Sequence, residues 1–339
     1  MKHTSAKSLI YLFICATVWG ISFVSQCASM EYIGPFTFSA VRCALGAIVL
    51  IPVIIVARMI AIRSIGKAVA GEGSGQGPDN NSGDGTVAAD KTARNPYIDI
   101  CNRSTLIGGI ISGVLLFIAS NLQTIALKTA SAGKGGFITA MYIIMVPVFG
   151  IFIHKKVGLN VWISVVIACI GLYLLCITDT FTLQSEDWLL LACAVFFAIQ
   201  ILTVDKYVAD ANGITMAAIE FAVCSVMSAV VMAAIETPSW AMIGECSTAI
   251  LYAGIGSCGV AYTLQIIGQK DADPTMASLV MSLESVVSVI AGAVILHQIM
   301  TGRELAGCAL MFAAIILAQL TDVLYAKRTN NQVESEVSS

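Results

Sequence analysis

The sequence predicts an all-α membrane protein with ten transmembrane helices arranged as two inverted five-helix repeats. Three observations support this prediction: ten apolar stretches close to the length of a spanning helix, a charged content of only 12% in 339 residues, and a likeness between the two halves of the chain. A bilayer core about 30 Å thick needs about 20 apolar residues of helix. Continuous apolar runs favour helices over the alternating strands of a barrel.

The expected helices follow one another through short polar links, with one longer insertion. Hydrophobic residues make up 58% of the chain and the mean hydropathy is +0.87, whereas a soluble domain carries about 25% charged residues. The first run follows Lys2 and Lys7 as a signal peptide would, but its length and the span directly after it favour a retained helix. The expected helices lie near residues 8–30, 33–57, 104–127, 135–154, 159–178, 187–204, 213–235, 246–268, 275–296 and 304–325.

Two segments differ from this apolar pattern. Residues 66–97 contain GEGSGQGPDNNSGDG, and residues 329–339 read TNNQVESEVSS. Such compositions cannot bury enough apolar surface to offset the entropy of the chain. We expect a flexible cytoplasmic insertion at 66–97 and a disordered cytoplasmic tail at 329–339.

The basic residues predict the orientation in the membrane. If the ten spans alternate, fourteen of the 18 Lys and Arg residues fall on the side of the N-terminus and three on the other side. This bias follows the positive-inside rule. We expect both termini in the cytoplasm of a multi-pass protein of the plasma membrane, most simply a bacterial inner or cell membrane.

An internal repeat relates the two halves. Gly133–Gly150 (GKGGFITAMYIIMVPVFG) aligns with Thr275–Gly292 (TMASLVMSLESVVSVIAG) at a shift of 142 residues. With five helices per half, the second half enters the membrane in the opposite orientation, as in many secondary transporters. The predicted repeats are 1–178 and 179–328, with the pathway between them in a functional monomer or a homodimer.

Four stretches resemble the EamA-type branch of the drug/metabolite transporter superfamily, and the resemblance covers almost the whole chain. It implies one EamA domain in each half and a carrier that moves small organic solutes through a central cavity, commonly as an exporter. The chain departs from the family pattern after the fourth and ninth helices, where His154–Lys155 and His297–Gln298 replace a usual Gly-Glu pair. The stretches are WGISF, SAVRCALGA, ALKTASAGKGGFITAMYIIMVPVFG and GVAYTLQIIGQKDADPTMASLVMSLESVVSVIAG.

Three ionisable residues lie at membrane depth. Each raises the free energy of membrane insertion by about 2.5–3.5 kcal/mol, so each requires a structural or functional explanation. Glu284 lies about ten residues into its expected helix. Its carboxyl could take part in proton-coupled movement, bind a substrate ammonium, or bond a neighbouring helix. Members of the resembled family commonly have an acidic residue at the position of Glu284, and they more often have Gln at the position of Glu220. For Glu220 and Arg42 a structural role is favoured over substrate binding or coupling.

Several uncharged side chains are candidates for the lining of a central cavity. They are spread over five expected helices, which suits aromatic walls with a few orienting amides. Hydrogen bonds between neighbouring helices are the alternative explanation. The predicted substrate-binding residues, Glu284 included, are Trp19, Asn121, Gln123, Tyr142, Gln200, Tyr262, Gln265 and Glu284.

The function predicted on this basis is a secondary transporter of small organic metabolites, with amino acids or related compounds as the first candidates and export as the favoured direction. Its partners would be a small-molecule metabolite, protons and the lipid bilayer; a channel or a non-transporting membrane scaffold is the alternative. No phosphate-binding loop is present to drive transport with ATP. With three histidines and no catalytic motif, an enzyme is not expected, and the eleven cysteines read as packing residues. No metal, cofactor or nucleic acid is expected.

Overall fold

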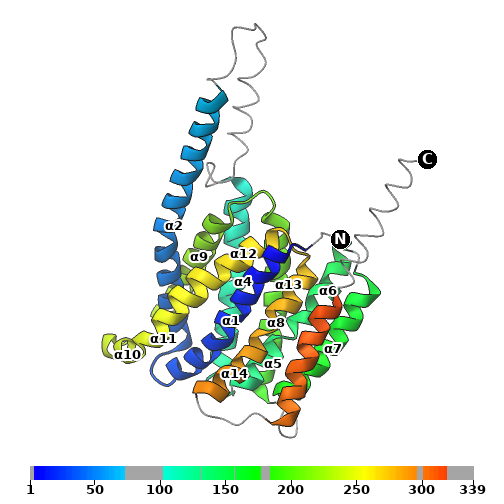
Figure 1. The fold of residues 1–339 in the computed structure, drawn as a ribbon. Helices are drawn as coiled ribbons and strands as arrows, with labels where there is room; N and C mark the ends of the chain where they lie inside the picture. Colours follow the sequence, from blue (N-terminus) through cyan, green and yellow to red (C-terminus); the bar gives the residue numbers. More distant parts are fainter. Residues whose placement is uncertain are drawn as a thin grey trace, which may run out of the picture.

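The structure, a computed structural model, describes residues 4–72, 102–130, 132–155, 157–176, 184–295 and 301–318. These residues form a bundle of helices, and no strand occurs in the described ranges (Figure 1). Within these ranges eight helices are long and apolar enough to cross a membrane, and Leu159–Leu174 is a shorter apolar helix. The predicted class of helical membrane protein is confirmed.

The first half of the chain folds into helices that begin close to the predicted positions. Asn102 caps its helix by accepting a hydrogen bond from the Thr105 N–H at 2.7 Å, which satisfies a free donor of the first turn. The helices are α1 (Ala6–Ser29), α2 (Pro35–Glu72), α4 (Arg103–Ala126), α5 (Ala132–Thr139), α6 (Tyr142–Phe152) and α7 (Leu159–Cys176).

Helix α2 is longer than predicted. It continues through Arg58 and Arg63 to Glu72, so residues 66–72 of the expected insertion are helical. The apolar pattern marks the part of a helix that lies in lipid, whereas Arg, Lys and Ala are good helix formers that extend it beyond the membrane. The remainder of the expected insertion, 73–97, and the expected tail, 329–339, lie outside the described residues.

The second half carries a comparable set of helices and one π-helical segment, η1. Asp273 caps the helix Pro274–Met281 (α13) by accepting from the Thr275 N–H at 3.0 Å, with Pro274 in the first turn. Residues 302–318 are also helical. The bounds are α8 (Ser185–Tyr207), α9 (Gly213–Ile235), α10 (Trp240–Glu245), α11 (Ser247–Leu251), η1 (Tyr252–Tyr262), α12 (Thr263–Lys270), α13 (Pro274–Met281) and α14 (Glu284–Ile295).

Two expected helices, 135–154 and 275–296, are each broken in the middle. The breaks fall at residues 140–141 and 282–283, which are separated by the 142-residue shift of the internal repeat. Several of their backbone hydrogen bonds correspond: Met141 N–H donates to the Ile138 carbonyl at 3.2 Å, and Leu283 N–H donates to the Val280 carbonyl at 3.2 Å. Both breaks are therefore the same local turn.

Helices from the two halves are interleaved. The most extensive pairings are α2 with α9, and α4 with both α8 and α9. Glu236, directly after α9, caps the start of α2: its carboxylate accepts from the Phe36 N–H at 3.1 Å, the Thr37 N–H at 2.7 Å and the Thr37 hydroxyl at 2.6 Å. A carboxylate at a helix N-terminus accepts hydrogen bonds from backbone N–H groups that have no partner within the helix. It also interacts favourably with the positive end of the helix dipole.

The closest approach between α1 and α14 depends on Gly20. A Cβ at this position would lie 2.6 Å from the Glu284 carbonyl oxygen and 2.6 Å from the Val287 Cβ. Gly20→Ala should therefore lower the free energy of unfolding by about 1–3 kcal/mol, as overpacking does. Gly158→Ala is the control because nothing lies within 4 Å of its Cβ. Unfolding of both variants in detergent measures the difference, and equal stabilities would refute this packing.

Candidate functional site

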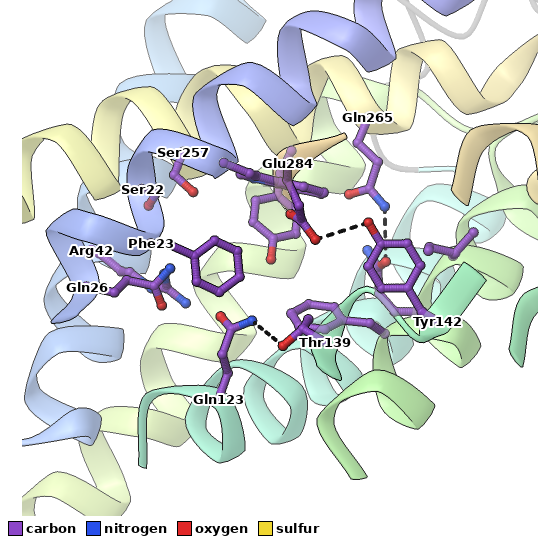
Figure 2. A pocket seen from close by; sticks show the side chains of 15 residues that line it. Ser22, Phe23, Gln26, Arg42, Gln123, Thr139, Tyr142, Ser257, Gln265 and Glu284 are labelled. Carbon is purple, nitrogen blue, oxygen red and sulfur yellow. Dashed lines mark hydrogen bonds between the residues drawn. The ribbon is translucent and has the colours of Figure 1, made fainter. Parts of the chain in front are cut away.

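A small cavity of about 30 Å³ lies in the middle of the bundle (Figure 2). Its lining comes from α1, α2, α4, α5, α6, α8, η1, α12 and α14, so both halves of the chain contribute. The lining residues are Trp19, Ser22, Phe23, Gln26, Arg42, Gln123, Thr139, Tyr142, Phe197, Gln200, Ile201, Ser257, Tyr262, Gln265 and Glu284.

The structure brings together most of the residues that the sequence singled out. Arg42 and all but one of the eight predicted substrate-binding residues line the cavity. The exception is Asn121, whose amide nitrogen donates to the Phe117 carbonyl at 2.7 Å and to the Ser228 hydroxyl at 3.2 Å. Asn121 therefore joins α4 to α9 and is not among the lining residues. Glu220 also lies outside the lining, behind Gln200.

Glu284 and Tyr142 meet at the two helix breaks. Each is the first residue after its break, the two are 142 positions apart, and the Tyr142 hydroxyl donates to the Glu284 Oε1 at 3.1 Å (Figure 2). The side chain of Glu284 is buried. Broken helices at the interface of two repeats are where many secondary transporters place their binding sites.

Arg42 supplies the positive charge of the cavity. Its guanidinium lies 5.1 Å from the centre of the Phe38 ring, and among the described residues no carboxylate forms an ion pair with it. Its Nε is buried without a hydrogen-bond partner. In Figure 2 Arg42 lies beside Gln26, on the opposite side of the view from Gln265. The cavity thus holds an acidic group and a basic group that are not paired with each other.

Aromatic rings form one wall of the cavity. The rings of Trp19 and Tyr262 are 4.6 Å apart between centroids, and Phe221 meets Tyr262 edge-on at 5.6 Å. Tyr262 is the last residue of η1. The wider turn of a π-helix is often found at functional sites because it redirects side chains. This wall gives the cavity an apolar body between its charged groups.

Two glutamines connect the cavity to a second buried carboxyl. Gln265 Nε2 donates to Gln200 Oε1 at 3.1 Å, and Gln200 Nε2 donates to Glu220 Oε1 at 2.9 Å. Glu220 and Gln200 have no exposed surface, and Gln265 is only 1% exposed. The Oε1 of Gln265 has no hydrogen-bond partner. The amides therefore form a directed chain that ends with an acceptor oxygen.

Some lining residues were not predicted from the sequence, including Ser22, Gln26 and Thr139. A signal was present for two of them, because Trp19, Ser22 and Gln26 follow the i, i+3, i+7 spacing of a single helix face. Thr139 had no such signal, since its position depends on the break that directly follows it. Its hydroxyl accepts from Gln123 Nε2 at 3.3 Å.

Residues 184–320 match the EamA-like transporter family. A protein of Archaeoglobus fulgidus described as an uncharacterized transporter is 26% identical over 213 residues, which is 62% of this chain and 68% of that protein. The resemblance drawn from the sequence is thereby confirmed, and these matches place the chain among membrane transporters.

A solved crystal structure of another protein shares the architecture. It superposes with a TM-score of 0.69 over 95% of this chain and 99% of its own length, at 18% identity. A likeness at this identity supports the fold alone.

The matched segment 184–320 provides part of the polar cavity lining. It contributes Gln200, Tyr262, Gln265 and Glu284, and the first half of the chain contributes Trp19, Arg42, Gln123 and Tyr142. Among the described residues no cluster of His, Cys, Asp or Glu has the arrangement of a metal site. The cavity therefore offers a ligand one acidic group and one basic group that are not paired with each other, together with amides and aromatic surface.

Proposed function

We propose that this protein is a secondary transporter of small organic metabolites, and that amino acids or related zwitterions are its substrates. The observation that carries the proposal is the central cavity with Arg42 and Glu284 unpaired to each other. A carboxylate suits the guanidinium of Arg42, and an ammonium suits the carboxyl of Glu284. An amino acid provides both groups on one small molecule.

The proposed mechanism is alternating access between two inverted five-helix repeats, 1–178 and 179–328. Support comes from the matched breaks at 140–141 and 282–283, whose hydrogen bonds correspond at the repeat shift. The hydrogen bond between Tyr142 and Glu284 joins equivalent positions of the two repeats. Rocking of one repeat against the other around such a fixed point opens the site to each side in turn.

The proposal extends to the membrane location, the topology and the energy source of transport. The protein would lie in the plasma membrane with ten spans and both termini in the cytoplasm, and would act as a monomer or a homodimer. Protons would drive export through the carboxyl of Glu284, which is buried in the cavity wall. A channel or a scaffold is the competing function, and either would lack carrier kinetics.

The test is uptake by proteoliposomes of the purified protein. A panel of labelled amino acids and related metabolites is offered with and without an imposed pH gradient. We expect saturable uptake of one or more zwitterions, enhanced by the gradient. Flux that does not saturate would favour a channel, and failure to take up any compound would contradict the proposal.

A further inference from the structure

Glu220 is a buried acid that the proposed transport cycle does not use. It lies on α9, its side chain has no exposed surface, and its Oε1 accepts from Gln200 at 2.9 Å. The α9 backbone at Glu220 is closely approached by α4, because a Cβ on Gly113 would lie 2.7 Å from the Glu220 carbonyl oxygen. Glu220 therefore has a fixed position next to Gln200, whose amide lines the cavity.

The hydrogen-bonding capacity of each group fixes the direction of the chain. The Oε1 of Glu220 accepts from Gln200, so Gln200 turns its NH₂ towards Glu220 and its oxygen away. That oxygen accepts from the NH₂ of Gln265 at 3.1 Å. The oxygen of Gln265 is then left facing the cavity without a partner. Reversing either amide would set oxygen against oxygen in a buried site, which is costly.

The cavity end beside Gln265 consequently offers acceptors. In Figure 2 the oxygen of Gln265 lies on the side of Glu284, where the Glu284 carboxyl and the Tyr142 hydroxyl are the neighbouring polar groups. The positive group, Arg42, is on a different part of the lining.

We propose that Glu220 is a positioning residue for substrate specificity: through Gln200 it holds the carbonyl oxygen of Gln265 towards the cavity, so that the site selects solutes with a cationic, hydrogen-bond-donating amino group at this end. The inference rests on the proposed transport function, because it names the chemical group that the same cavity recognises. It assigns Glu220 a role without direct contact between its carboxyl and the solute.

The first test compares two probes that differ only at the amino position. L-leucine carries an ammonium, whereas 4-methyl-2-oxopentanoate carries a carbonyl oxygen, which can only accept. Their affinities are measured by ligand-induced thermal stabilisation and by competition in uptake. Glu220→Gln leaves the amide chain free to reverse, so we expect the preference for leucine to narrow by about tenfold, the value of one buried hydrogen bond.

Glu236→Gln is the matched control. It makes the same chemical change at the other end of α9, where the carboxylate caps α2 outside the cavity lining. We expect it to alter stability and to leave the ratio of the two affinities unchanged. An unchanged ratio in folded Glu220→Gln, or an equal change in both variants, would overturn the proposal.

A second measurement is independent of any ligand. Solid-state NMR on wild-type protein with ¹⁵N-labelled glutamine side chains and ¹³C-labelled glutamate carboxyls reports which end of Gln200 faces Glu220, with Gln200→Met identifying the signal. We expect strong coupling from the Gln200 nitrogen to the Glu220 carboxyl carbon. Its absence would refute the inference even if transport is established. If neither probe binds, the choice of amino acids as substrates fails, and the NMR result still decides the role of Glu220.

Discussion

Glu284→Gln is expected to abolish uptake driven by a pH gradient and to leave at most downhill equilibration. The amide retains the size of the carboxyl and an oxygen that can accept from Tyr142, which lies 3.1 Å away in the native protein. It cannot bind and release a proton or balance an ammonium. Because a buried group with one charge state cannot couple proton movement to the solute, driven uptake should fall by at least about tenfold. Initial rates in proteoliposomes with and without the gradient measure this.

Tyr142→Phe is the matched control for that result. It removes the hydrogen bond to Glu284 and keeps the ring and the titratable carboxyl. We expect a smaller effect, with gradient dependence retained. If Glu284→Gln still responds to the gradient as the wild type does, Glu284 is a structural carboxyl that holds the two helix breaks together.

Arg42→Met is expected to weaken the binding of carboxylate-bearing solutes by about ten- to a hundredfold, the value of a hydrogen bond to a charged group. Methionine is long and apolar, so it preserves packing against Phe38 while removing the charge. Amines without a carboxylate should bind Arg42→Met about as well as they bind the wild type. The KM values for both solute classes, with thermal melting of the variant, measure this.

The same experiment separates the two roles considered for Arg42. A structural anchor would lower the melting temperature and change the KM for acids and amines alike. A substrate ligand would change the KM for carboxylates selectively. Equal changes in both KM values would therefore assign Arg42 to the scaffold.

The sequence was sufficient for the helical membrane class and for about half of the cavity lining. Trp19, Gln200 and Gln265 are polar or amphipathic groups within apolar runs, and such groups face a bundle interior because lipid does not solvate them. Asn121 satisfies the same rule by bonding Ser228, since the rule cannot distinguish a cavity from a helix–helix contact.

The helix breaks could not be read from hydropathy. Residues 135–154 and 275–296 each have the hydropathy of one continuous span, and Pro147 lies inside α6, after the break. The second break follows from local competition: the hydroxyl of Ser278 donates to the Thr275 carbonyl at 2.8 Å, and that of Ser282 to the Leu279 carbonyl at 2.7 Å. Such side-chain bonds to the backbone weaken a helix in ways that apolar periodicity does not record.

The directed amide chain is a second feature that pattern alone did not reveal. Glu220 and Gln200 lie on different helices, α9 and α8, and nothing in their spacing predicts that they meet. Only tertiary packing brings Glu220, which lies outside the cavity lining, into contact with the amide of Gln200, which is part of it.

Trans-stimulation tests the central claim, that this protein is a carrier which exposes one cavity to each side in turn, most directly. Proteoliposomes are loaded with an unlabelled amino acid found to be a substrate, and entry of the labelled compound from outside is followed. The account predicts faster entry than into empty vesicles, because a loaded site returns more quickly. Entry that internal solute does not accelerate and that does not saturate would indicate a channel and contradict the account.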